Sequence, residues 1–168
     1  MRLTSALLCV LVAVCVPHVC AMTLVDEAEP SAVIVIPDAP LPVEKFAAEE
    51  LQYHVLRASG AELSIVAESE MREGPVVILG ACAATAAAGI LPDELEPNEW
   101  VGRLVGERLY LAGDDSDGPA AWVMHNNRTR VGTLFAVYEL IERELGVKWL
   151  GPGELGEVFP KKKSIPLP

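Results

Sequence analysis

Carboxylates are the side chains of this 168-residue chain whose spacing comes nearest to a reactive or metal-binding pattern. Asp114, Asp115 and Asp117 fall within four residues, and Glu154 and Glu157 lie in a second segment that is rich in glycine and proline. Grouped acids can bind Ca²⁺, but the first loop lacks the further ligands and the distal Glu of an EF-hand. Glycoside hydrolysis needs two carboxyl groups set across a sugar bond, and loop acids alone do not establish that pair. We therefore expect these acids to be solvated.

The other reactive side chains are scattered. His54 falls in a helical pattern and His125 in a loop pattern, and His54 is expected to be a packed residue. Cys82 lies in an alanine-rich stretch that favours a small buried thiol. The chain has no HExxH, GxSxG or GxGxxG motif, and "GPG" at 151–153 precedes no helix that could bind phosphate. The sequence predicts no catalytic residue, metal ligand or cofactor.

The first 21 residues, "MRLTSALLCVLVAVCVPHVCA", resemble a secretory signal peptide, with Arg2 before an apolar run and Ala21 before the expected cleavage site. We expect a secreted or periplasmic protein that starts at Met22 and has no membrane segment after cleavage. An uncleaved membrane anchor is the alternative, although Pro17 interrupts the run, and a lipoprotein signal is weaker still. Cleavage leaves Cys82 as the single cysteine, so no internal disulfide is expected.

Charge is unevenly distributed along the chain. Residues 22–122 contain 19 acids and five bases, whereas residues 123–168 contain five acids and seven bases. The net charge of the whole chain is −11, which argues against a nucleic-acid partner. The change in balance suggests two different surfaces, although a solvated acidic surface with a lysine tail explains the charges as well.

The apolar pattern predicts one α/β (α+β) domain, with a mixed sheet of about five strands and two main helices packed on it. The expected strands are 32–36, 62–68, 75–80, 100–106 and 108–115, with a tight turn between the last two and a further short strand at "VKWL". The first main helix follows Pro42 and stops at Gly60, with Glu44 on its polar side. The second stops at Gly146, and its expected core face contains Val131, Leu134, Phe135, Tyr138, Ile141 and Leu145. A short helix is expected at 81–89 and a long loop at 114–130.

Four segments together carry a family resemblance: "KFAAEELQYHVLRASGAELSIV", "VVILG", "LYLAGDD" and "GTLFAVYELIERELGVKWLGPGELGEVFP". They resemble the N-terminal domain of α-glucuronidase-like glycoside hydrolases. They are also similar to the α/β domain that precedes the barrel in bacterial β-N-acetylhexosaminidases, and to the opening domain of large secreted bacterial proteins. The resemblance spans roughly residues 30–160 and implies a non-catalytic accessory domain at 22–160, with 161–168 as a truncated linker toward a catalytic (β/α)₈ barrel.

The resemblance also implies a surface for that barrel, supplied in cis or by a neighbouring gene, and "WLGPGELGEVFP" as the corner that turns the chain toward it. A surface turn that closes the domain's own core is the alternative for this corner. The expected docking surface consists of Trp122, Arg128, Arg130, Trp149, Glu154, Glu157 and Phe159. A polysaccharide is a further expected partner. A free-standing carbohydrate-binding or protein-interaction module and a small enzyme remain as alternative functions.

Overall fold

A computed structural model of the chain describes residues 22–119 and 129–168, apart from the Glu154 side chain. Its main element is a five-stranded mixed sheet in the order β4-β3-β5-β7-β6. The bounds are β3 Val33–Ile36, β4 Ile65–Ala67, β5 Val76–Leu79, β6 Trp100–Val105 and β7 Arg108–Gly113. The pairs β3·β4, β3·β5 and β5·β7 are parallel, and β6·β7 is antiparallel. The predicted fold class is confirmed.

The strands follow from short apolar runs. All four residues of β5 are buried, as expected for a central parallel strand with both faces covered. Strands β6 and β7 form the predicted hairpin, with Gly106 at a φ of 58° in its turn. Strand β4 is shorter than the predicted 62–68, since it begins only at Ile65. After Ala67 the chain enters a 3₁₀ turn at Glu68–Glu70, where the Ser69 amide and hydroxyl both donate to Asp38 Oδ1.

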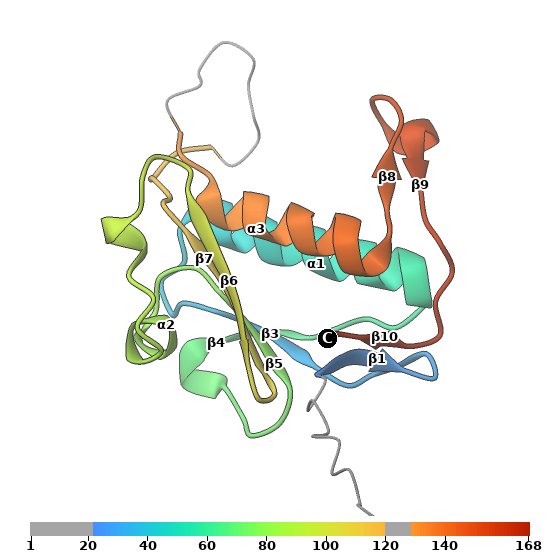
Figure 1. Cartoon of the computed structure of the whole chain (residues 1–168), viewed down its shortest axis with the longest axis horizontal. Helices are drawn as coiled ribbons and strands as arrows, with labels where there is room; N and C mark the ends of the chain where they lie inside the picture. The colour runs from blue at the N-terminus through green and yellow to red at the C-terminus, as the bar shows by residue number, and fades with distance from the viewer. Residues whose placement is uncertain (1–21, 120–128) are drawn as a thin grey trace, which may run out of the picture.

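Helices α1 (Pro42–Ser59) and α3 (Gly132–Leu140) lie side by side on one face of the sheet, while the short helix α2 (Ala83–Ala87) lies toward the other face (Figure 1). Helix α1 ends at Gly60, whose φ of 86° and bond from its amide to the Leu56 carbonyl form a left-handed cap. Helix α3 continues into a π-helical turn, Ile141–Leu145, and ends at Gly146. None of the helices in the described part of the chain is long and apolar enough to span a membrane.

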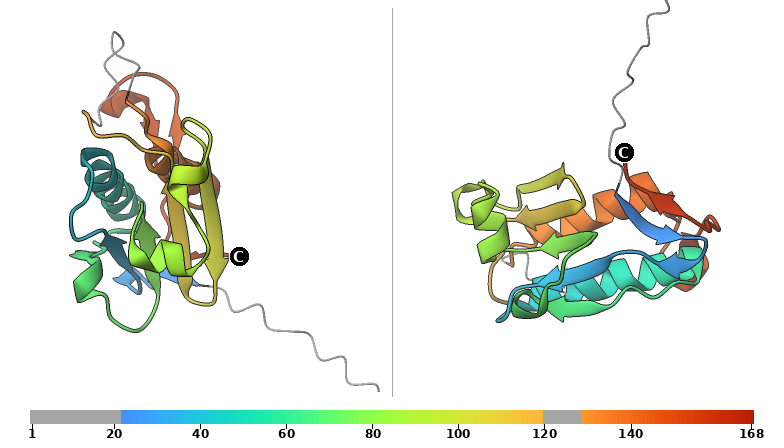
Figure 2. Two further views of the ribbon diagram at one scale, coloured as in Figure 1. Left: turned by 90° about the vertical axis from the view of Figure 1, so that its left-hand side faces the viewer. Right: turned by 90° about the horizontal axis from the view of Figure 1, so that it is seen from below.

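Other elements cover both faces of the sheet (Figure 2), and buried side chains form a core on each face. On the helix side, Ile34, Val77 and Leu79 of the strands pack with α1 and α3. On the opposite side, Val35, Ile78 and Tyr110 pack with Ile90 and are covered by the segments around α2. Cys82, which we expected to be buried, is half-buried at this second layer.

The predicted core face of α3 is partly wrong. Phe135 is 43% exposed, whereas Ala136, Val137 and Leu140 are buried. Ile141 and Leu145 are completely buried, as predicted. The helix sequence GTLFAVYEL is apolar almost all round, so its periodicity does not fix which side faces the sheet.

The ends of the domain form a second, three-stranded sheet in the order β10-β1-β2, with β1 at Thr23–Asp26, β2 at Glu29–Pro30 and β10 at Ile165–Pro166. The side chains of Ile165 and Leu167 are buried. Residues 161–168, which we expected to be a truncated linker toward a barrel, therefore pack against the domain. The chain ends beside the start of β1 (Figures 1 and 2).

Candidate docking surface

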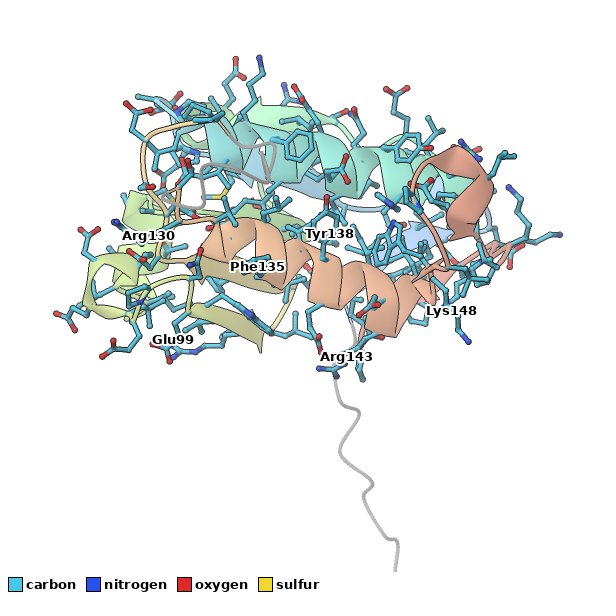
Figure 3. The ribbon with its side chains drawn as sticks, turned by 90° about the horizontal axis from the view of Figure 1, so that it is seen from above. Glu99, Arg130, Phe135, Tyr138, Arg143 and Lys148 are labelled. Atoms are coloured by element: carbon cyan, nitrogen blue, oxygen red, sulfur yellow. The ribbon has the colours of Figure 1, made fainter. Side chains whose placement is uncertain are left out.

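The two loops of the expected docking surface lie at opposite ends of α3 and its π-helical turn. Arg130 precedes the helix and Lys148 follows it, with Phe135 and Tyr138 on the face between them (Figure 3). Fourteen helical residues separate the two loops by about 20 Å. Trp122, His125 and Arg128 lie outside the described residues, so the structure bears on Arg130, Trp149, Glu157 and Phe159, and on the backbone of Glu154.

Arg130 closes the base of the long loop between β7 and α3. Its guanidinium lies 2.5 Å from Asp114 Oδ2, and its amide donates to Ser116 Oγ at 2.8 Å. Asp114 Oδ2 also accepts the Asn98 amide at 3.2 Å, and Asn98 Oδ1 accepts the Val131 amide at 2.8 Å. These contacts give Arg130 a structural role, since its charge is already paired within the domain.

Asp115, which we expected to be a solvated loop acid, also forms a hydrogen bond within the domain. Its Oδ1 accepts the Thr133 amide at 3.0 Å, which satisfies a free N–H in the first turn of α3. Burial raises the pKa of this carboxyl, and the charge of Asp114 raises it further against the opposing Thr133 bonds. Its Oδ2 is buried and has no hydrogen-bond partner among the described atoms. No group of three metal-binding side chains occurs in residues 22–119 and 129–168.

The second loop is a β-hairpin made of β8 (Lys148–Trp149) and β9 (Glu157–Val158). The Leu150 amide donates to the Gly156 carbonyl at 2.7 Å, and a 3₁₀ turn at Glu154–Gly156 forms the tip. The hairpin projects beyond the helix layer, away from the sheet (Figure 1). The predicted strand at "VKWL" therefore exists but pairs outside the main sheet.

Aromatic rings anchor the base of this hairpin on the helices. The Trp149 ring meets the Tyr138 ring edge-on at 5.4 Å and the His54 ring at 5.5 Å. The Phe159 ring lies 5.6 Å from His54, with the Arg57 guanidinium 4.7 Å above its centre. Trp149 and Phe159 thus bury part of their surface against neighbouring rings. These rings form one aromatic cluster, which consists of Tyr53, His54, Tyr138, Trp149 and Phe159.

His54 is the buried centre of the aromatic cluster, with 1% of its surface exposed. Its Nδ1 lies 2.7 Å from the Glu50 carbonyl oxygen, which can only accept, so Nδ1 carries the proton. Nε2 is buried and has no hydrogen-bond partner in the described structure. The expectation of a packed histidine is confirmed.

Carboxylates also border the aromatic cluster. The Tyr138 hydroxyl donates to Glu50 Oε2 at 2.9 Å, and burial together with the Glu50 charge raises the pKa of Tyr138. The Tyr53 hydroxyl lies 3.4 Å from Glu157 Oε2. Glu157 is thus half-buried at the hairpin base, and nothing is described for the Glu154 side chain.

Apolar side chains of the hairpin are exposed to solvent, both toward its tip (Leu150 and Leu155) and in its two-residue ladder (Trp149 and Val158). Leu155 is fully exposed, Leu150 is 76% exposed, and Trp149 and Val158 retain 37% and 45%. Phe135 is a further exposed ring on α3. Exposed apolar groups that cluster in this way mark interaction sites more often than scattered ones do. Sequence reasoning selected Trp149 here but missed Leu150, Leu155 and Val158.

The corner "WLGPGELGEVFP" does not lead the chain away from the domain. After Pro160 the Lys162 amide donates to the Ala58 carbonyl at 3.0 Å, and the chain returns along the domain to pair with β1. The corner therefore contains a surface turn that closes the domain on itself, and its role toward a barrel stays a prediction.

Glu44 is the buried acid that sequence reasoning misplaced. We expected it on the polar side of α1, yet only 2% of its surface is exposed. Its Oε2 accepts the Leu41 amide at 2.7 Å and its Oε1 accepts the Ala81 amide at 2.8 Å. Burial raises the pKa of Glu44, and these two bonds oppose the shift. The available signal was a Glu at the third helical position, two residues after Pro42, where the Glu of a capping box stands.

Comparisons with known proteins give a likeness in fold. No protein-family model matches the sequence, and no curated protein matches it. One solved structure with a matching fold is described as a novel family GH115 4-O-methyl-α-glucuronidase with specificity for decorated arabinogalactans. The TM-score is 0.54, with 17% sequence identity over 86% of this chain. The match spans only 17% of the glucuronidase's length, and at this identity it establishes the fold alone.

Proposed function

We propose that residues 22–168 form a non-catalytic accessory domain of a secreted, α-glucuronidase-like glycoside hydrolase. The observation that carries the proposal is the fold shared with a GH115 glucuronidase in which the matching region is a small part of a much longer chain. The glycan and the catalytic centre would then belong to a (β/α)₈ barrel, supplied in cis or by a neighbouring gene. Fold likeness supports this assignment by analogy.

The acids of the domain support a non-catalytic role. Asp114 pairs with Arg130, Asp115 caps α3 and Glu44 caps α1. Each of these carboxylates therefore has a structural partner in the folded domain. Hydrolysis needs two carboxyl groups facing a sugar across an open cleft. Engaged acids of this kind suit a scaffold better than a catalyst.

The proposed docking surface is centred on the hairpin tip. Leu150, Leu155 and Val158 offer exposed apolar area on a hairpin whose base is fixed by the Trp149 and Phe159 rings. Apolar anchors with a rigid base match the central contacts of protein interfaces. Arg130 is at most a rim residue, because Asp114 already neutralises it.

An activity assay tests the first half of the proposal. Purified residues 22–168 should give no turnover of aryl glucuronides, aryl hexosaminides or xylan fragments. Turnover that is lost in Asp115→Asn or Glu154→Gln would overturn the proposal and make this chain a small enzyme. Turnover that survives both changes would indicate a contaminating hydrolase.

A binding assay tests the second half. The double variant Leu150→Ser/Leu155→Ser should bind a purified barrel from the same or a neighbouring gene about tenfold more weakly than wild type. Val105→Ser is the matched control, since Val105 is 55% exposed in the distant β6–β7 hairpin. Equal binding by both variants would exclude the hairpin tip as the docking site.

A carbohydrate-binding module is the second candidate, and one cavity favours it. Tyr138, Glu142 and Trp149 line a surface cavity of ≈ 410 Å³ that combines two rings with a carboxylate. Rings with a few polar groups are typical of small-molecule sites. Xylan oligosaccharides should then quench tryptophan fluorescence, and Trp149→Ala should abolish the change while Phe135→Ala retains it.

A further inference from the structure

The carboxyl ends of β3 and β5 form the topological switch point of the main sheet, and the space between the segments that leave them is called the crevice below. These strands are neighbours, yet the connection from β3 leads through α1 to β4 on one side. The connection from β5 leads through α2 to the β6–β7 hairpin on the other side. Open α/β sheets bind ligands in the crevice where neighbouring connections diverge in this way.

Glu44 occupies this crevice with its own carboxylate. One donor comes from each wall: the Leu41 amide from the segment after β3, at 2.7 Å, and the Ala81 amide from the segment after β5, at 2.8 Å. The carboxylate also lies at the N-terminus of the 18-residue helix α1, where the helix dipole favours negative charge. Backbone amides and a helix N-terminus are the groups that bind anionic ligands in such folds.

Gly80 lets the backbone approach this carboxylate. It has a φ of 74°, and a Cβ built on it would lie 2.0 Å from Glu44 Oε1. Its own amide is fixed by the Leu111 carbonyl at 3.0 Å, so the segment cannot withdraw without losing a sheet bond. A glycine that allows close approach to an anion is a feature of ligand sites at switch points.

We propose that Glu44 is an internal ligand, which fills the anion site at the switch point of the sheet and keeps external anions out. Removing its carboxylate should open a site for a small monocarboxylate. The proposal does not depend on the accessory function or on the docking surface. It explains why a sheet with a ligand-binding topology can serve as a scaffold, because the protein's own side chain satisfies the donors of the crevice.

Acetate rescue of Glu44→Ala tests the proposal. The substitution deletes one carbon and the carboxylate, and acetate carries the same heavy atoms. The melting temperature of the variant should rise by about 3 °C or more in acetate relative to chloride at equal ionic strength, by ligand linkage. Acetamide, which has the same shape without the charge, should have a smaller effect. Wild type and Glu49→Ala, an exposed position on the same helix, should show no acetate-specific rise.

A second measurement locates the acetate. In the ¹⁵N–¹H spectrum of Glu44→Ala, the amide protons of Leu41 and Ala81 should shift downfield as acetate is added, while those of wild type do not move. Asp115 adds a negative charge near this crevice. Glu44→Ala/Asp115→Asn should therefore bind acetate more tightly than the single variant does.

Each outcome decides the matter. Acetate-specific stabilisation with shifts at Leu41 and Ala81 supports an internal ligand. A folded Glu44→Ala variant whose melting temperature does not respond to acetate overturns it. Amide chemical-shift changes confined to residues other than Leu41 and Ala81 also overturn it. If Glu44→Ala is unfolded in chloride, refolding in acetate but not in acetamide supports the proposal, and failure to refold in both overturns it.

Discussion

The Trp149 ring stands edge-on to the Tyr138 ring, with 5.4 Å between their centres. Trp149 belongs to the β8–β9 hairpin and Tyr138 to α3, so one ring pair connects the projecting hairpin to the helix layer. The hairpin's own ladder is only two residues long on each side. Its position therefore depends on side-chain packing at its base more than on its backbone hydrogen bonds.

Trp149→Ala should free the hairpin while leaving the main sheet intact. An aromatic pair is worth about 0.5–1.5 kcal/mol beyond its area burial, and a two-residue ladder does not hold without it. Amide hydrogen exchange should show loss of protection at Leu150, which donates to Gly156, with no change in β5. Phe135→Ala is the control, and equal protection in both variants would contradict the anchoring role.

Ile141→Ala and Phe135→Ala form a matched pair on one helix. Ile141 is completely buried, so its truncation should lower the free energy of unfolding by about 2–5 kcal/mol. Phe135 is 43% exposed, and its truncation should cost about 0.5 kcal/mol or less. Urea denaturation of both variants provides the measurement. A larger loss for Phe135→Ala would mean that the described face of α3 is incorrect.

Ile165→Ala should destabilise the domain by about 2–5 kcal/mol, because Ile165 is buried in the core beneath the α1–α3 layer. Lys161→Ala, an exposed position in the same segment, should change stability by about 0.5 kcal/mol or less. Thermal unfolding followed by circular dichroism separates the two. An unchanged melting temperature for Ile165→Ala would mean that residues 161–168 are not packed in the core.

The pH dependence of stability should reflect Asp115. Its folded-state pKa is raised above the ordinary value of 3.8, chiefly by burial, so the folded state holds a proton more tightly than the unfolded state. The stabilisation that results is complete below that value and is lost as pH rises through the folded pKa. The Asn side chain of Asp115→Asn does not ionise, so the variant does not lose this stabilisation. The free energy of unfolding of wild type should therefore fall relative to that of the variant as pH increases. A difference between wild type and Asp115→Asn that does not change with pH would contradict the raised pKa of Asp115.

Export should remove residues 1–21, as their charged start and apolar run predict. Intact mass spectrometry of exported protein should give the mass of residues 22–168. Met22 is buried and its carbonyl accepts the Leu167 amide at 2.6 Å, so cleavage one residue later should lower stability. Retention of the first 21 residues in exported material would refute the signal prediction.

The sequence was sufficient to predict the strands of the main sheet and the presence of both long helices, but not the strand order or the buried face of α3. Continuous apolar runs such as Val76–Leu79 and a clear stop at Gly60 leave little choice of structure. The two-residue strands Ile165–Pro166 and Glu157–Val158 were not predicted, because they are too short to show a period, whereas the strand at Lys148–Trp149 was. Their pairing is set by tertiary contacts with segments far away in the chain.

The candidate site was less predictable than the fold. Glu44 shows why, since its bond to the Leu41 amide is local, whereas its second bond and its contact with Gly80 come from the distant segment Gly80–Ala81. Arg130 is the opposite case. Its position near aromatic residues in the sequence suggested an interface residue, but in the structure its charge is paired with Asp114. Both assignments depend on which loops meet at the carboxyl ends of the strands, which local sequence does not encode.

The antiparallel pairing of β1 with β10 also determines how the domain responds to tension. Thr23 pairs with Pro166, so the two strand ends that lead out of the domain lie at the same end of the ladder. A force that pulls residues 22 and 168 apart would load these hydrogen bonds one after another, as in unzipping, and not together, as in shear. Ile165 and Leu167 would leave the core with β10. In a single-molecule pulling experiment the domain should therefore be mechanically weak, with the main sheet released only after its terminal strands have separated.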